Sequence, residues 1–336
     1  MKKQFLMAMI LMAAVGARAE DAATTASQTT NTMNANVSDT NKAQVKDIDD
    51  EITNARLRAQ LGSKSRWSFK SALGYSGGSI NEPTSDTRPN YRASATVEGL
   101  PGLAGTIGIN YRLTERDNLS LNTGINIVDP LHGGITKPVF DPREGENKGK
   151  SISRYQVATP SLDWSRGYKA FGIQNISEAT LSYNTDSDSA DLNALGDLAL
   201  SQTVLADLGA SNWSGGLAFT YDYSFYGGSV NNKDYVPALE AHKLVRSDMM
   251  VALYPFAEYA FNDKYSFRTV FGYFEFFHNK AEYNNRTTFY QQEPYQSVGV
   301  GISVTRDIYV YPNIQFAPKD IRADRTNVAL SKNINI

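Results

Sequence analysis

The sequence contains no cysteine, which excludes disulfide bonds and thiolate chemistry. It has only three histidines, and its 33 lysines and arginines nearly balance its 35 aspartates and glutamates. That balance gives no basic footprint for binding nucleic acid. Beyond residue 15, no segment approaches the ~20 apolar residues that a transmembrane helix requires. The chain must therefore rely on a buried core, on hydrogen-bonded strands or on a bilayer that strands can cross.

Aromatic residues are abundant, although the mean hydropathy is negative: 19 Tyr and 15 Phe stand among many Asn, Ser and Gly. Apolar and polar residues alternate along several segments, namely 103–114, 119–127, 213–223 and 298–304. Successive side chains of a strand point to opposite faces, so each segment has one apolar face and one small, mostly uncharged polar face. A barrel with lipid outside and water inside needs this pattern.

The segment 326–336 has the same alternation. Its apolar residues, from Val328 to Ile336, share one face, which Lys332 interrupts. This ending resembles the C-terminal assembly signal of Gram-negative outer-membrane β-barrel proteins, although it ends in Ile rather than Phe or Trp. The resemblance implies an all-β fold, a transmembrane antiparallel barrel over 66–336. It also implies outer-membrane lipid around the barrel and insertion by the barrel-assembly machinery through the last strand.

The first residues have the three parts of a secretory signal peptide: two lysines, an apolar run from Phe5 to Val15, and small residues before a cleavage site after Ala19. We therefore expect a signal peptide at 1–19. Residues 20–44 are Thr, Ser, Asn, Ala and Asp with almost nothing to bury, which predicts a disordered periplasmic tether.

Residues 45–62 are expected to form a short amphipathic helix that ends at Gly62. Its apolar residues step by 3, 4, 3, 4, which is a heptad seam: Val45, Ile48, Ile52, Ala55 and Ala59. Three interpretations remain open. The helix packs on the periplasmic rim, joins protomers as a coiled coil through 45–59 in a homo-oligomer, or folds inside the pore.

Short and long connectors alternate after residue 66, as periplasmic turns and extracellular loops do. One short turn is predicted near Ser165–Gly167. The count gives about twelve strands, with ten or fourteen as alternatives, and an even number places both termini in the periplasm. The strands are predicted at 66–76, 103–114, 118–128, 153–163, 170–184, 197–206, 213–226, 248–261, 265–278, 295–304, 308–316 and 326–336.

One hairpin specifies its own register. If Phe261 faces Tyr265, then Tyr259 faces Phe267 towards lipid, and Glu258 faces Arg268 towards the lumen. Aromatic pairs and opposite-charge pairs are both favourable across antiparallel strands.

We expect a porin-like channel for passive diffusion of small hydrophilic solutes, without cofactor, metal or catalysis. Six charged residues of mixed sign are predicted to line the pore and to give weak ion selectivity: Lys70, Arg112, Glu178, Asp222, Glu258 and Arg268. Two alternatives remain. One is a non-conducting surface-display barrel whose loops bind partners. The other is an outer-rim hydrolase, for which His278 is the candidate residue.

Overall fold

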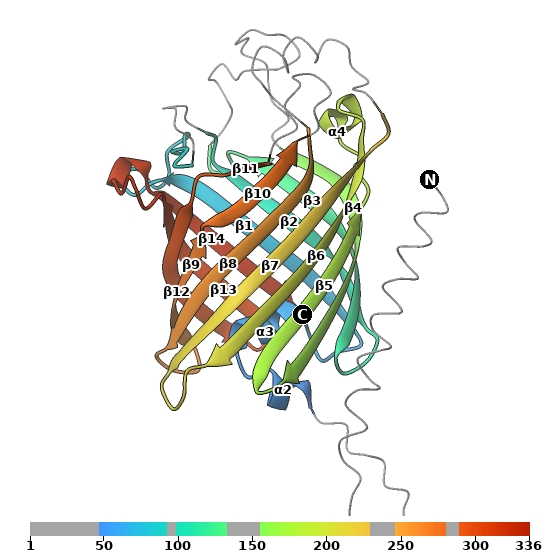
Figure 1. The fold of residues 1–336 in the computed structure, drawn as a ribbon, viewed down its shortest axis with the longest axis vertical. Helices are drawn as coiled ribbons and strands as arrows, with labels where there is room; N and C mark the ends of the chain where they lie inside the picture. The colour runs from blue at the N-terminus through green and yellow to red at the C-terminus, as the bar shows by residue number, and fades with distance from the viewer. Residues whose placement is uncertain (1–46, 93–98, 133–154, 229–245, 280–288) are drawn as a thin grey trace, which may run out of the picture. The chain divides into compact units, whose positions relative to one another are not determined.

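Twelve strands close into one antiparallel barrel (Figure 1). The computed structural model describes residues 47–92, 99–132, 155–228, 246–279 and 289–336. The predicted signal peptide and tether lie outside these ranges, as do parts of four long connectors. The ring strands are β1 (Trp67–Ser79), β2 (Gly102–Arg112), β3 (Asp117–Val128), β4 (Tyr155–Ala170), β5 (Ile173–Ser182), β6 (Ala194–Asp207), β7 (Trp213–Tyr226), β8 (Ser247–Ala260), β9 (Tyr265–Gly272), β12 (Tyr295–Thr305), β13 (Ile308–Phe316) and β14 (Asn327–Asn335).

The last strand pairs with the first, and this pairing closes the ring. Two further strands, β10 (Phe274–Asn279) and β11 (Phe289–Gln291), extend the wall at the end that carries the long connectors. The prediction of about twelve strands is confirmed. The predicted register is also confirmed, because Tyr259 pairs with Phe267 and Glu258 with Arg268.

The turn predicted near Ser165–Gly167 is wrong. β4 continues to Ala170, and the chain reverses at Phe171 and Gly172, whose φ angles are 52° and 80°. Two-residue hairpins with positive φ at both positions match the twist of the flanking strands. Gly167 instead lies within β4. A side chain inside the lumen packs against it, as the next subsection describes.

The two faces of the wall differ as the alternation predicts. Small polar side chains such as Ser68, Asn110 and Ser120 are buried on the inner face. Large apolar side chains such as Phe69 and Leu121 are exposed on the outer face. In the described part of the chain, no helix has the length and apolar content needed to cross a membrane.

The helix predicted over 45–62 is two short helices, α2 (Ile48–Glu51) and α3 (Ala55–Leu61). The break falls before Asn54, whose side-chain oxygen accepts a hydrogen bond from the Leu57 amide and caps α3. Gly62 ends α3, as predicted. Both helices lie at the end of the barrel that carries the short turns (Figure 1). Two further short elements, α4 (Ser187–Asp191) and a 3-10 turn (Ala323–Arg325), belong to connectors.

Candidate functional site

Residues 47–64, here called the lumen segment, are seated on the inner wall of the barrel by an apolar cluster. Four side chains of the segment belong to this cluster, and each is at most 4% exposed: Ile48, Ile52, Leu57 and Leu61. The wall contributes Ile176, Leu205 and Phe256. These three side chains are apolar, whereas most inward positions of the wall carry polar groups. Together they form the apolar surface, here called the seat, against which the segment packs.

Glycine makes room for the segment at two points. A Cβ atom on Gly167 would lie 2.3 Å from Leu61 Cδ1, so this leucine packs into the space that a side chain at position 167 would fill. Gly62 has φ of +112°, and a Cβ there would lie 2.4 Å from the Asn335 amide nitrogen. The first contact explains the glycine that resembled a turn residue in the sequence.

A buried charged cluster joins the segment to the neighbouring strands β8 and β9. Arg56 Nε donates to Glu258 Oε1 at 2.9 Å, and Asn54 Nδ2 donates to Glu258 Oε2 at 2.7 Å. Arg268 Nε lies 3.0 Å from the same carboxylate. The two guanidinium groups also lie over the Phe256 ring, at 4.8 and 5.4 Å from its centroid. A buried carboxylate shared in this way holds the segment in one position, because removing a partner leaves a buried charge unpaired.

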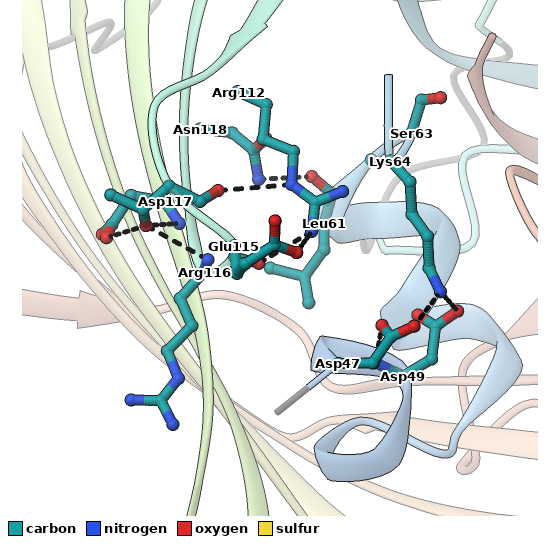
Figure 2. Close-up of polar contacts among 12 residues, drawn as sticks. Asp47, Asp49, Leu61, Ser63, Lys64, Arg112, Glu115, Arg116, Asp117 and Asn118 are labelled. Atoms are coloured by element: carbon teal, nitrogen blue, oxygen red, sulfur yellow. Dashed lines mark hydrogen bonds and ion pairs between the residues drawn. The ribbon is translucent and has the colours of Figure 1, made fainter. Parts of the chain in front are cut away.

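Further hydrogen bonds fix the backbone of the segment. The Gln174 side-chain oxygen accepts from the amides of Thr53 and Asn54, both at 2.9 Å. Asn118 Nδ2 donates to the Leu61 carbonyl oxygen at 2.9 Å, a contact shown in Figure 2. The break between the two helices and the end of α3 leave backbone groups without partners inside a helix. Side chains of the wall supply these missing hydrogen bonds.

Ion pairs anchor the segment to the short turns. Arg306 donates to both oxygens of Asp49, the shortest contact being 2.7 Å, and Arg116 lies 2.7 Å from Glu51. Lys64 lies between Asp47 and Asp49, at 2.6 and 2.8 Å (Figure 2).

The anchor changes the acidity of Asp49. Burial opposes ionisation of Asp49, but hydrogen bonds from Arg306 and Lys64 outweigh that effect and lower its pKa to about 2. The hydrogen bond to Asp47 is the main reason that the pKa of Lys64 is raised. Both ions are therefore stabilised in the anchored state.

Two polar cavities lie against α3. The larger, of about 490 Å³, is lined from the segment by Arg56, Ala59 and Gln60. The smaller, of about 340 Å³, is lined partly by the turns at 211–212 and 261–264, so it lies towards the short-turn end. Arg56 and Tyr309 line both cavities. The layer of these two residues and the Glu258 cluster therefore separates the cavities.

The six predicted pore-lining residues fall in different places. Lys70, Glu178 and Arg268 line the larger cavity, and Glu258 lines the smaller one. Arg112 instead donates to the carbonyl oxygens of the turn at 114–115 (Figure 2). Asp222, an inward residue of β7, lines neither cavity. Arg56 and Gln60 were missed because helical periodicity does not disclose that a helix lies inside a barrel.

The long-connector end has its own contacts. Arg92, from the connector between β1 and β2, pairs with Glu275 and lies 4.7 Å from the centroid of the Tyr295 ring. His278 Nδ1 lies 2.5 Å from Asp248 Oδ1. The neighbouring Ser247 hydroxyl donates to backbone carbonyl oxygens, so in the described part of the chain it is not bonded to the imidazole.

The outer wall completes the description. Its exposed residues are apolar across many strands, among them Val157, Leu200, Phe219, Val300 and Leu330. An even-numbered, closed antiparallel ring with an apolar outside and a polar inside matches one class of protein. The fold is that of an outer-membrane β-barrel. That class resides in the outer membrane, where the exposed apolar face contacts lipid.

Comparison with known proteins adds similarities of fold. No protein-family model matches the barrel sequence, and no curated protein matches it. Solved structures that resemble it include the COG4313 outer membrane channel from Pseudomonas putida F1, with 11% identity and a TM-score of 0.49, over 82% of this chain and 97% of that one. The NanC porin has 9% identity and a TM-score of 0.40, over 80% and 99%. The KdgM porin has 9% identity and a TM-score of 0.37, over 79% and 99%.

Proposed function

We propose that this outer-membrane barrel is a channel for passive diffusion of small hydrophilic solutes, and that the lumen segment controls passage. One observation carries the proposal: polar cavities of about 490 and 340 Å³ occupy the lumen on either side of the layer that contains Arg56 and Tyr309. A lumen that only needed to be sealed would have no need of two hydrophilic spaces in series.

The lumen segment would act as a movable barrier. Its seat lies inside a wall that is otherwise polar, so its withdrawal would leave a hydrophilic path along the barrel axis. Solutes would then meet Asn, Ser, Gly and Thr side chains, with the mixed charges of Lys70, Glu178, Glu258 and Arg268 setting a weak ion selectivity. A coiled coil between protomers stays a prediction, and it would require Ile48, Ile52 and Ala59 to leave their buried positions.

The orientation in the membrane follows from the rule that short turns face the periplasm. Under this rule the lumen segment, both chain ends and the predicted tether at 20–44 would be periplasmic. The signal peptide would be removed after Ala19. Assembly through the last strand at 326–336 belongs to the same proposal.

Planar-bilayer conductance tests the function. We expect rare or small current steps from the chain that begins at Glu20, and frequent larger steps from a variant that lacks residues 20–64. Heat modifiability on gels would verify that both barrels are folded. If neither folded barrel passes current, the channel is refuted.

A sealed display barrel is the second candidate. The observation that favours it is the anchoring of the lumen segment to the wall by Asp49–Arg306, Glu51–Arg116 and Arg56–Glu258 together. A permanently sealed barrel predicts no current from the full chain at any voltage. Its surface loops would still bind a partner. Current steps from the full chain that disappear when the segment is locked in place would rule it out.

A further inference from the structure

The larger cavity has the dimensions of a binding site. Its volume of about 490 Å³ falls within the roughly 300–1,000 Å³ typical of small-ligand pockets. Three basic side chains line this cavity, namely Arg56, Lys70 and Arg268. Lys332 also borders it, but alternation with the inward Ser331 turns the Lys332 side chain to the outer face.

One end of the cavity has excess hydrogen-bond donors. Arg56 and Arg268 share the single carboxylate of Glu258, at 2.9 and 3.0 Å. Arg56 is only 8% exposed, and its Nη2 atom has no hydrogen-bond partner among the described residues. Arg268 Nε likewise lacks a well-aligned acceptor there. Buried guanidinium groups without full partners are costly, so this end is suited to a carboxylate.

The other end has an uncompensated acid. Glu178 Oε2 accepts hydrogen bonds from Gln60 at 2.8 Å and from Ser201 at 3.2 Å. Within the described ranges, no basic group lies at ion-pair distance from Glu178. The other lining acid differs, because Asp163 lies 3.6 Å from Lys70. Glu178 is therefore free to receive an ammonium group.

Gln60 joins the two ends. Its amide nitrogen donates to Glu178, and its side-chain oxygen accepts from Arg56 Nη1 at 3.5 Å. The Arg56 guanidinium and the Glu178 carboxylate thus lie on either side of one amide group. A small solute that carries both charges could replace or lie along this bridge.

We propose that the larger cavity binds a small zwitterionic solute, with its carboxylate at Arg56 and its ammonium group at Glu178. The proposal rests on the channel function and names the class of solute. The lining acids Asp163 and Glu178, together with Glu258, which pairs with both arginines from the smaller cavity, balance the charges of Arg56, Arg268 and Lys70. The cavity therefore has no net charge to attract a simple ion. A singly charged solute would leave one end unmatched, and a neutral one would leave both unmatched.

Isothermal titration of the full, detergent-solubilised barrel tests this with three probes of equal carbon length. We expect 4-aminobutyrate to bind about tenfold or more tightly than butyrate or butylammonium, because each of these lacks one charge-assisted contact. Glu178→Gln should weaken 4-aminobutyrate by about tenfold and leave butyrate unchanged. Asp222→Asn is the matched control, the same acid-to-amide change on the inner wall outside both cavities, and it should alter neither affinity.

Equal affinity for butyrate and 4-aminobutyrate would overturn the proposal in favour of an anion site. Absence of binding by every probe would overturn it outright. A weakening by Asp222→Asn equal to that by Glu178→Gln would show a general charge effect and would also overturn it. In each case, persisting bilayer conductance would leave the channel function standing.

Discussion

Ile52→Ala should release the lumen segment without unfolding the barrel. The Ile52 side chain is fully buried in the cluster with Leu57, Ile176 and Leu205. Truncating a buried isoleucine to alanine costs ~2–5 kcal/mol. The barrel wall keeps all its strand hydrogen bonds in this variant, so the loss falls on seating of the segment. The unseated population should therefore rise about 30-fold to a few thousand-fold.

A cysteine at position 59 reports that population. Ala59 is 2% exposed and packs with Tyr309 and Tyr311, so a thiol there reacts with maleimide only when α3 leaves the wall. The chain has no native cysteine, so the label is specific. When reseating outpaces labelling, the rate follows the open population. Ala59→Cys combined with Ile52→Ala should label about 30-fold faster or more than Ala59→Cys alone.

Ile173→Ala is the control, because Ile173 stands on the outer face of β5, one residue before the inward Gln174. It should change the labelling rate by no more than about twofold. Equal rates in the Ile52→Ala and Ile173→Ala backgrounds would refute the seat. So would labelling of Ala59→Cys alone at the rate of an unstructured peptide.

Three further outcomes are expected. The pKa of Asp49, about 2, lies below the ordinary aspartate value of 3.8, so its contribution to seating is complete above about pH 4 and is lost as the pH falls towards 2. The open fraction in bilayers should therefore rise as the pH falls through that range, and Asp49→Asn should flatten the response. Glu258→Gln leaves two buried guanidinium groups without a carboxylate, which should destabilise the seated segment by ~3–5 kcal/mol and speed the cysteine labelling. An unchanged labelling rate would contradict the role of the cluster. Leu61→Cys with Gly167→Cys should form a disulfide, since a Cβ at 167 lies 3.1 Å from Leu61 Cγ. Oxidation should abolish the current and a reductant should restore it. A current that responds to neither would show that the segment does not control passage.

Much of the wall could be predicted because strand alternation is read over neighbouring residues. The hairpin at 261–265 was predicted in register, since aromatic and charged pairs agreed on one alignment. The turn at 171–172 was missed because Gly167 resembled a turn residue. Gly167 instead leaves space for Leu61, which is more than a hundred positions earlier in the chain.

One wall residue of the seat could have been recognised in the sequence. Gln174, Ile176 and Glu178 share the polar face of one strand, and the isoleucine among them has no reason to face water. An apolar residue on a wet face predicts something that covers it. The residue pattern could have raised that question, but it could not have identified the covering helix.

Short-range physics in the chain was enough to specify a barrel, its inner and outer faces and most of its turns, because a period of two residues decides which side chains meet lipid. Occupation of the lumen depended on partners far apart in the chain. Asp49 meets Arg306 across 257 positions, and Arg56 meets Glu258 across 202. Only closure of the ring brings these groups to one place, where buried charge and apolar surface require a partner and the lumen segment supplies it.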